Sequence, residues 1–507
     1  MNHRAAQVSI GLAILVQACE GHLVESHLLP PTGGGSSAAL AFRIGGSGTD
    51  RARGVAVDPS GNVYVAGTFT GSVDFDPGNG ASGLTSLGAT DGFLAKYTGA
   101  GAFVWAVRFG GAEADSVTAL VRDNAGNLYV AGGFQGTAAT FGSSATPPSL
   151  NSAGGEDGFV AKITSDGAVV WARRFGGLSS ERIEDVAVDP SGNLYAVGEF
   201  SVQADAIPAS GGTVVSNGSE PDGFVVSFDG SGAVRWAFPV GGAAEDHALA
   251  VQVTSGGSVV VAGTFQGNAD FAPGTATSGL VAVGGTDVFV ASYTSAGTLE
   301  WARGIGGTGN EDVATGGLAA DAGGGVAATG RFAGSVDFDP GAGQAIRTSL
   351  GTSDVYVVRL DASGAFQSVF TLGGVTGTPT VGDLAFAADG NLLVTGSFTG
   401  SVDFDPGAGT HIITGLGGTG TDIFVARYAP AGSLLWVSRF GDPVNGAGNP
   451  NGGAAVASDA SNAVYVAGQF FGTPNFDPGT GSFRLISLGD ADGFVVKLTA
   501  DGALARP

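Results

Sequence analysis

Short apolar segments separated by glycine-rich turns recur along the whole chain. The first clear unit begins with GVAVD, continues through a PSGN turn, and reads VYVAGTF from Val63 to Phe69. A longer polar connection then leads to DGFLAKYT, a GAG turn and FVWAVRFGG, which ends at Gly111. Turns of this length and composition join antiparallel strands as hairpins. We therefore expect each unit to be a meander of four antiparallel strands.

This unit occurs in seven copies, and its second strand is the clearest marker. The marker reads VYVAG, LYVAG, LYAVG, VVVAG, VAATG, LLVTG and VYVAG, ending at Gly67, Gly132, Gly198, Gly263, Gly330, Gly396 and Gly468. Apolar residues fill consecutive positions in these strands, so both faces of each sheet need cover. No segment has a sustained helical period, so the sheets must cover one another. A propeller, whose sheets stack around an axis, meets this requirement.

The two ends of the chain together complete one unit. The seventh copy ends after its third strand, DGFVVKLT (Asp492–Thr499), and lacks a fourth. The segment LAFRIGG (Leu40–Gly46) precedes the first copy and aligns with the fourth strands WAVRFGG and WARRFGG. We predict an all-β, seven-bladed β-propeller of four-stranded antiparallel blades over residues 39–507, in which the N-terminal strand pairs in the last blade and closes the ring.

The unit also resembles a known repeat. GVAVDPSGNVYVAGTF, followed by DGFLAKYTGAGAFVWAVRFGG, is similar to the SBBP-type β-propeller repeat of bacterial exported and cell-surface proteins, and more distantly to NHL-type repeats. The resemblance extends from Leu40 to Pro507 and implies the propeller fold. For function it implies only a place at the cell surface or outside the cell, because propellers host both binding and catalysis.

The first residues have the pattern of an export signal. Arg4 precedes an apolar stretch, Ala5–Val16, that is too short to span a bilayer, and the sequence VQAC then ends at Cys19. This stretch resembles a bacterial lipoprotein signal, in which the cysteine becomes a lipidated N-terminus. We expect a signal peptide over residues 1–18, a flexible tether over 19–38, and a lipid anchor at Cys19 in the outer membrane or at the cell surface. An ordinary signal peptide would instead give a secreted protein.

Charge narrows the range of partners. The 507 residues include 21 basic and 45 acidic residues, and the net charge is −24. This charge repels a phosphate backbone, and no cluster of basic and aromatic residues resembles a nucleic-acid groove, so we expect no nucleic-acid partner. It also disfavours a polybasic attachment to anionic lipid, which leaves the lipid anchor as the expected link to a membrane. We expect a monomer whose partner is an unidentified protein or glycan at the cell envelope.

Two residue types recur at fixed positions. An aspartate begins every third strand, and we interpret it as an acceptor of backbone N–H groups that fixes the preceding loop. These aspartates are Asp91, Asp157, Asp222, Asp287, Asp354, Asp422 and Asp492. A tryptophan lies at one place in five fourth strands, and we interpret it as filling the space between blades; a stacking surface for sugars is the alternative. The tryptophans are Trp105, Trp171, Trp236, Trp301 and Trp436, with Ser368 and Leu40 at the corresponding places of the other two strands.

The motif SVDFDPG, in the connection between second and third strands, is the candidate metal site. Its complete aspartate pairs are Asp74 and Asp76, Asp337 and Asp339, and Asp403 and Asp405. Residues two apart in an extended segment point the same way, so each pair could offer two carboxylates to calcium. Calcium prefers six or more oxygen ligands, and the motif lacks the acidic series of an EF-hand. The alternative is a strand end with an inward phenylalanine and a Pro-Gly turn.

The motif is incomplete in the other copies. Asn475 with Asp477 is a near match, only Asp270 remains in the fourth copy, and the second and third copies lack the motif. Calcium therefore stays one hypothesis for these loops, and no other cofactor is expected.

Further acidic residues gather where a fourth strand connects to the next first strand. These residues are Glu113, Asp115, Glu181, Glu184, Asp185, Glu245, Asp246, Glu311 and Asp312. In a propeller these connections and the long second-to-third connections emerge on one rim, which we expect to be strongly acidic and to favour cations or basic partners.

Evidence for catalysis in the sequence is thin. No nucleophile elbow, zinc-protease motif or C-x-x-C pair occurs, and the histidines have no metal-ligand spacing. We therefore expect a binding or scaffolding module. Two alternatives stay open: an enzyme acting on a glycan through carboxylates on the loop-rich rim, and a calcium-stabilised adhesin.

Overall fold

The computed structural model describes residues 40–506, apart from 79, 202, 205–213, 216–219, 273–277, 417–419 and 444–450. In this part the chain is all-β and antiparallel, built around sheets of four strands. The described residues form no helix, and so none of them belongs to a helix able to cross a membrane. The predicted signal peptide, Cys19 and the tether lie outside the described residues.

Four classes of strand repeat along the chain. The first strands are β2 (Arg51–Val57), β8 (Ser116–Arg122), β14 (Glu181–Val188), β20 (His247–Val253), β24 (Leu318–Ala320), β30 (Thr378–Phe386) and β36 (Gly452–Ser458). The second strands are β3 (Val63–Phe69), β9 (Leu128–Phe134), β15 (Leu194–Phe200), β21 (Val259–Asp270), β25 (Val326–Phe332), β31 (Leu392–Thr399) and β37 (Val464–Phe470). The third strands are β6 (Asp91–Tyr97), β12 (Asp157–Ile163), β18 (Asp222–Phe228), β22 (Gly279–Tyr293), β28 (Asp354–Leu360), β34 (Asp422–Tyr428) and β38 (Asp492–Leu498). The fourth strands are β7 (Phe103–Gly110), β13 (Val169–Phe175), β19 (Val234–Gly242), β23 (Leu299–Gly307), β29 (Phe366–Leu372), β35 (Leu434–Phe440) and, from the N-terminus, β1 (Ala41–Gly46).

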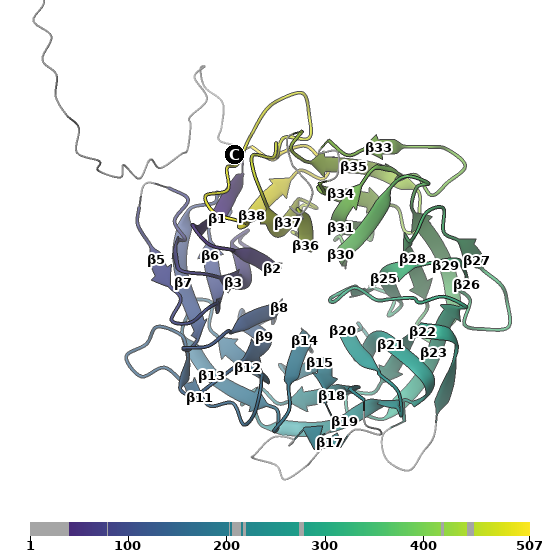
Figure 1. Ribbon diagram of the computed structural model, residues 1–507, viewed down its shortest axis with the longest axis horizontal. Helices are drawn as coiled ribbons and strands as arrows, with labels where there is room; N and C mark the ends of the chain where they lie inside the picture. Colours follow the sequence, from purple (N-terminus) through teal and green to yellow (C-terminus); the bar gives the residue numbers. More distant parts are fainter. Residues whose placement is uncertain are drawn as a thin grey trace, which may run out of the picture. The chain divides into compact units, whose positions relative to one another are not determined.

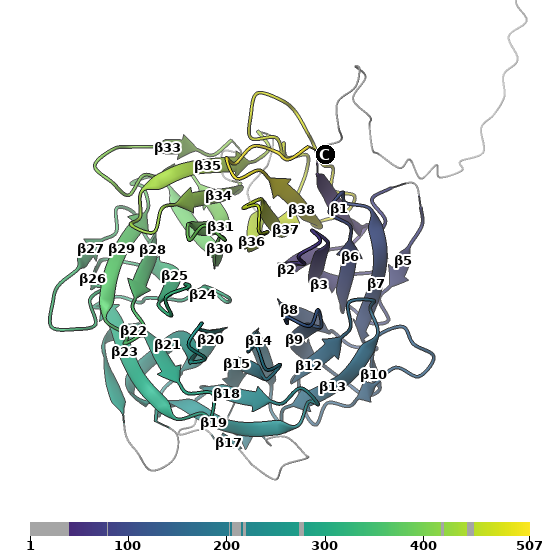
Figure 2. The same ribbon diagram turned by 180° about the vertical axis from the view of Figure 1, so that it is seen from behind.

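The strands between residues 40 and 506 make up what we call the folded unit. Its sheets lie around a common centre, with the first strands innermost and the fourth strands outermost (Figures 1 and 2). Each first strand contacts the first strand of the next sheet, and β36 in turn contacts β2. The strand β1 lies beside β38, where Ala41 is opposite Val496 and Ile44 is opposite Gly493. The N-terminal segment thus supplies the fourth strand of the sheet that contains β36, β37 and β38.

The hydrophobic core lies between neighbouring sheets. Alternate residues of β3 face opposite sides: Val65 and Phe69 belong to a cluster shared with β1 and β38, whereas Tyr64 belongs to one shared with β9 and β12. Six of the seven residues of β3 are buried. A strand buried on both faces needs apolar side chains at successive positions, which explains why these strands do not alternate.

Short hairpins formed by the second-to-third connections lie at the outside of the arrangement (Figure 1). They are β4 (Ser72–Asp74) with β5 (Gly83–Thr85), β10 (Ala139–Phe141) with β11 (Ser149–Leu150), β16 (Gln203–Ala204) with β17 (Val214–Val215), β26 (Ser335–Asp337) with β27 (Ile346–Thr348), and β32 (Ser401–Asp403) with β33 (Ile412–Thr414). The strand β4 pairs with the end of β1, and β26 pairs with the end of β23. The strand β10 pairs with the end of β7 in the same way, whereas β16 and β17 pair only with each other. Most of these hairpins therefore join a sheet to the fourth strand of the sheet before it.

Candidate functional site

The aspartate at the start of each third strand is buried, and all seven side chains are between 0 and 2% exposed. The Oδ2 atom of Asp91 accepts the N–H of Leu87 at 3.0 Å, and Asp157 accepts the N–H of Ala153 at 2.8 Å. An arginine of the fourth strand pairs with the same carboxylate in some copies, as Arg108 does with Asp91 at 2.6 Å. These aspartates lie at the first residue of a third strand, or within it in the case of Asp287, and none of them lines the central cavity described below.

Many of the acidic residues expected on the rim are also buried. Asp115, Glu181, Asp246 and Glu311 are 1 to 2% exposed. Asp115 accepts the N–H of Gly111 at 2.6 Å and the N–H of Gln135 at 3.0 Å, which ties two loops together. Burial is the main cause that raises the pKa of Asp115 to about 6 and that of Glu311 to about 7. The prediction of a strongly acidic rim is therefore too strong, because these carboxyl groups serve the backbone and do not face solvent.

The D-F-D motif forms the strand and turn of the outer hairpins. Phe75 is 1% exposed, and its carbonyl accepts the hydroxyl of Tyr97 at 3.0 Å. The Oδ1 atom of Asp74 accepts the N–H groups of Asp76 at 3.1 Å and Ser82 at 2.9 Å. Asp337 and Asp403 accept the corresponding N–H groups. One oxygen of the first aspartate thus closes the loop by itself.

Two variants of the motif show which parts the hairpin uses. Asn475 accepts the N–H groups of Asp477 and Phe483 at 3.1 and 2.7 Å, so an amide oxygen can replace the carboxylate. The second copy lacks the motif, yet β10 and β11 form the same hairpin with Phe141 buried. No group of three or more potential metal-ligating side chains occurs within the described residues. Calcium binding by these aspartates stays a prediction.

The tryptophans of the fourth strands pack against the next sheet. The indole Nε1–H of Trp301 donates to the carbonyl of Ala362 at 3.0 Å, and its ring covers Gly364. Trp105, Trp171, Trp236 and Trp436 make the same contact with the following sheet. At the two places without tryptophan, Leu40 covers Gly101 and Phe370 covers Gly432. The residue that replaces tryptophan in β29 is therefore Phe370, two positions after Ser368.

A cavity of about 290 Å³ lies at the centre of the folded unit, where the first strands approach one another. Most first strands carry a β-bulge at the same place, such as Ala52/Gly54 in β2, Ile183/Asp185 in β14 and Val381/Asp383 in β30. A bulge adds one residue to a strand and redirects its side chains. These bulges bring Arg53, Glu184, Asp185 and Asp383 to the cavity, and they are the charged residues among those described that line it.

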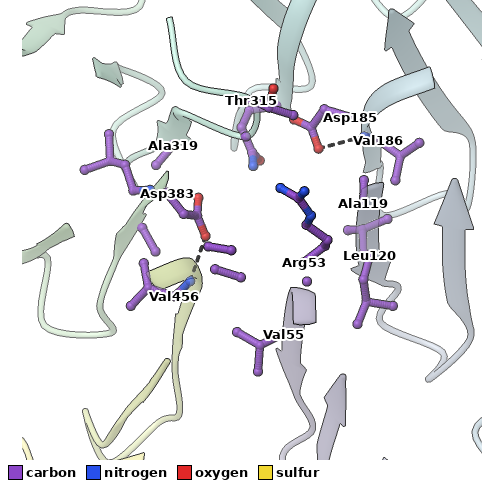
Figure 3. A pocket seen from close by; sticks show the side chains of 18 of the residues that line it. Arg53, Val55, Ala119, Leu120, Asp185, Val186, Thr315, Ala319, Asp383 and Val456 are labelled. Carbon is purple, nitrogen blue, oxygen red and sulfur yellow. Dashed lines mark hydrogen bonds between the residues drawn. The ribbon is translucent and has the colours of Figure 1, made fainter. Parts of the chain in front are cut away.

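Asp185 and Asp383 occupy equivalent positions in β14 and β30. The carboxylate of Asp185 accepts the N–H of Val186 at 2.8 Å and, from the next first strand, the N–H of Val251 at 2.9 Å. Asp383 accepts the N–H groups of Leu384 at 2.7 Å and Val456 at 2.8 Å in the same way. Each carboxyl group thereby joins two neighbouring first strands and also faces the cavity (Figure 3).

Both residues are partly buried. Burial raises the pKa of Asp185 to about 7 and that of Asp383 to about 8, and the charge of Asp185 contributes to the shift at Asp383. Burial also raises the pKa of Glu184. Near neutral pH Asp185 and Asp383 can therefore hold protons, so each could donate as well as accept a hydrogen bond.

Arg53 extends into the cavity from β2, with its guanidinium group directed to the side where Asp185 and Thr315 lie (Figure 3). Its side chain is exposed, and it makes no hydrogen bond or ion pair with any residue in the described part of the chain. Gln252 and Thr315 add neutral polar groups to the lining. The cavity therefore combines one unpaired cation with carboxyl groups that can be neutral or charged.

The sequence interpretation missed this site. The sequence pattern predicts Glu184 and Asp185 in the acidic rim loops, but they lie within β14 and line the central cavity. Nothing in the motifs points to Arg53 or Asp383. A signal was present in the repeats: where the other first strands have Gly54, Ala119, Ala250, Gly317 and Ala455, the third and sixth copies have Asp185 and Asp383. An acid in an otherwise apolar strand at a position of small residues marks a local departure from the repeat.

Comparisons with known proteins concern the repeat and the fold. A family model described as the beta-propeller repeat SBBP matches residues 43–71. An uncharacterized WD repeat-containing protein of Acanthamoeba polyphaga mimivirus is 24% identical over 92% of this chain and 39% of its own length. The regulatory protein FlaEY of Caulobacter vibrioides is 28% identical over 36% of this chain and 17% of its own length. The chain thus spans well under half of the length of the curated relatives that it matches.

One solved structure similar to this chain is the WD40 β-propeller domain of Doa1. The similarity has a TM-score of 0.39 at 11% identity and covers 91% of this chain and 97% of that domain. The match of the family model confirms the resemblance that the sequence analysis stated for the SBBP-type repeat.

Proposed function

We propose, from the premise that this chain is a β-propeller repeat protein, that it is an exported, lipid-anchored binding or scaffolding module at the bacterial cell envelope. In this proposal the folded unit is a seven-bladed propeller that β1 closes, and its ligand site is the central cavity. The lipid anchor is Cys19, which follows the signal peptide of residues 1–18.

The distribution of charge among the copies carries the binding proposal. Side chains that a repeated fold requires recur in every copy, as the aspartate of the third strand does. Arg53 and Glu184 each occur at the bulge in a single copy, and an acid at the following position occurs in only two copies, as Asp185 and Asp383. The other copies fold with glycine, alanine, threonine or leucine at these positions. These charges gather in one cavity. Asp185 and Asp383 also bond backbone N–H groups of the fold, but Arg53 makes no such bond, so a ligand is the better explanation for Arg53.

Contacts around the ring support closure by β1. Leu40 covers Gly101 as the tryptophans cover the turn glycines of the other sheets, which joins the last sheet to the first. The first strands also contact one another in sequence, including β36 with β2. Every sheet in this arrangement has a neighbour on both faces, as its apolar composition requires.

Binding is tested with the full-length chain carrying a C-terminal tag, produced in a bacterial host. The chain is used to capture partners from envelope fractions and is applied to a glycan array. We expect capture of a defined glycan or envelope protein that is lost when Arg53 and Asp383 are replaced together by glutamine and asparagine. Capture that is unchanged in this double variant would place binding elsewhere, and no capture from any fraction would contradict the proposed function.

The anchor is tested separately. Cys19→Ser should release the protein from the membrane fraction and abolish the mass increase of lipidation at the N-terminus. A chain that stays in the membrane fraction after Cys19→Ser, or whose mature N-terminus is unmodified, would contradict anchoring and favour secretion.

The alternative of a glycan-acting enzyme has one observation in its favour. Asp185 and Asp383 line one cavity, and the raised pKa of each suits a general acid near neutral pH. Both oxygens of each carboxyl group already accept backbone N–H groups, however, which holds these side chains against the strands. Binding is therefore the function that we favour.

A further inference from the structure

The central cavity selects a class of ligand by its size. Its volume of about 290 Å³ lies at the lower limit of the roughly 300–1,000 Å³ that small-molecule sites occupy. A ligand enclosed here is therefore about as large as one sugar ring or one amino acid. A folded protein domain can contact the mouth of the cavity but cannot fill it.

Arg53 selects an anionic group. Its guanidinium is unpaired among the described residues and projects into the cavity. A guanidinium has five N–H donors in a planar fork and binds a carboxylate through two parallel hydrogen bonds. The charge of Glu184 acts on Arg53 from across the lining, but no hydrogen bond or ion pair forms between them. A ligand carboxylate would give the guanidinium a direct partner.

The carboxyl groups on the other side of the cavity select hydroxyl groups. Asp185 and Asp383 come from β14 and β30, and both oxygens of each are already fixed by backbone N–H donors. Carboxyl oxygens held in this way can accept a hydrogen bond from a ligand hydroxyl through a remaining lone pair. A protonated carboxyl group can also donate a hydrogen bond to a ligand hydroxyl. An ammonium group would instead need ionised carboxylates, and burial opposes their ionisation. Hydroxyls suit both protonation states.

We propose that the central cavity binds a monosaccharide-sized sugar acid, with its carboxylate on Arg53 and its ring hydroxyls on Asp185 and Asp383. This inference rests on the proposed binding function and names the ligand class of that site. Gln252 and Thr315 lie in the lining and offer further hydrogen bonds to hydroxyl groups.

The affinity of the site for an anionic ligand should depend on pH. The charged and titratable groups that line the cavity are Arg53 from β2, Glu184 and Asp185 from β14, and Asp383 from β30, within the described part of the chain. Arg53 stays protonated over the working range, whereas the three carboxyl groups ionise as the pH rises. Each ionisation adds a negative charge beside an anionic ligand. Affinity for a sugar acid should therefore fall as the pH rises through about 7 to 8.

The test uses isothermal titration of the full chain, made as the Cys19→Ser variant so that it is free of lipid, with glucuronate as the probe. Glucose lacks the carboxylate and acetate lacks the hydroxyls, so these serve as matched ligands. We expect glucuronate to bind at least tenfold more tightly than either one, and Arg53→Gln to weaken it at least tenfold. Affinity should also fall severalfold between mildly acidic and mildly alkaline buffer.

Arg331→Gln is the matched protein control, because Arg331 lies in β25, pairs with Asp312 at 2.7 Å and does not line the cavity. It should leave glucuronate binding unchanged. Asp383→Asn keeps the size of the side chain and should weaken binding of glucuronate without unfolding the protein, which thermal denaturation checks.

Two outcomes would overturn the inference: no binding of glucuronate at tens of millimolar, or equal affinity in the Arg53→Gln variant. If the chain still captures an envelope partner while glucuronate fails, the ligand class is wrong and the binding function stands. If both fail, the proposed function fails as well.

Discussion

The aspartate that begins each third strand lies in an environment made of backbone groups. Its carboxylate leaves no room for a side chain on the glycine that ends the fourth strand: a Cβ added to Gly306 would lie 2.4 Å from the Oδ1 atom of Asp287. The first glycine of this pair thus fits beside the buried aspartate, whereas the second, Gly307, lies against the backbone of Ser335 in the outer hairpin. A second acid can lie close to the same carboxylate. In the case of Glu311, the charge of Asp287 raises the pKa of Glu311 further.

This pairing of acids predicts a stability that depends on pH. Asp287 Oδ1 and Glu311 Oε1 are buried and have no hydrogen-bond partner. Burial and the charge of Asp287 raise the pKa of Glu311 from 4.5 to about 7, so the folded state holds the proton more tightly than the unfolded state. Ionisation of Glu311 therefore destabilises the folded state, and this loss of stability is complete above pH 7. The loss disappears as the pH falls toward 4.5.

We expect Glu311→Gln to stabilise the fold by about 1–3 kcal/mol in mildly alkaline buffer and to have no stabilising effect below the ordinary pKa of glutamate. Urea denaturation at several pH values measures this difference. Glu113→Gln, at an exposed acid of an equivalent loop, is the control and should show no such trend. A variant less stable than the native chain at alkaline pH would contradict the shift.

At the scale of elements, the outer hairpins and the tryptophans join neighbouring sheets. The hairpin strands β4, β10 and β26 pair with the preceding fourth strand, and each tryptophan covers the turn glycine of the following sheet. Both contacts act at the wide periphery, where radially arranged sheets diverge.

Graded substitutions of Trp301 test the peripheral contact. Trp301→Phe keeps a ring over Gly364 but loses the hydrogen bond to Ala362, and should cost about 1 kcal/mol. Trp301→Ala also removes the packing and should cost about 3 kcal/mol. Phe370 shows that the fold accepts phenylalanine at such a contact. Chemical denaturation gives both values, and equal losses for the two variants would exclude the packing contribution.

The first aspartate of the D-F-D hairpin allows its two interpretations to be separated. Asp403 accepts the N–H groups of Asp405 at 3.0 Å and His411 at 2.8 Å through one oxygen. Asp403→Asn should therefore change stability by less than about 0.5 kcal/mol, whereas Asp403→Ala should cost about 1–3 kcal/mol. The melting temperature is measured with calcium and with a chelator. A calcium-dependent rise that Asp403→Asn abolishes would favour the metal hypothesis.

For the whole molecule, the decisive contact is between the two ends of the folded unit. The strand β1 buries Phe42 and Ile44 and covers the edge of β38. Without β1, the strand β38 would present unpaired N–H and C=O groups, which favour aggregation.

We expect deletion of residues 40–46 to cost about 5 kcal/mol or more, from the lost burial of two large side chains and the lost strand pairing. Deletion of residues 1–38 is the matched control and should leave the melting temperature unchanged. Thermal denaturation and size-exclusion chromatography measure the two effects. A stable, monomeric protein after the first deletion would contradict closure of the ring by β1.

The repeated features can be predicted without the structure. Seven copies of one pattern show which residues every unit needs, so the strands, the turns, the recurring aspartates and the tryptophans could all be located by comparing copies. The pairing partner of β1 was also predictable, because a missing fourth strand and an extra one occur in the same chain. These features depend on local hydrogen bonds and on apolar patterns, which a repeat displays several times over.

The positions of the charged residues that occur in one or two copies follow from the fold and not from the repeat pattern. Arg53, Asp185 and Asp383 are far apart in the sequence, and it is the circular arrangement of the first strands that brings them to one cavity. The bulges that direct them inward leave little trace in the pattern of apolar residues. Burial likewise reversed the expected role of Asp115 and Glu311, because an acid in a loop looks the same in sequence whether it faces water or backbone N–H groups. Comparing the copies of a repeat shows which residues they share, whereas the fold places the residues in which the copies differ, because it brings the first strands of distant copies together.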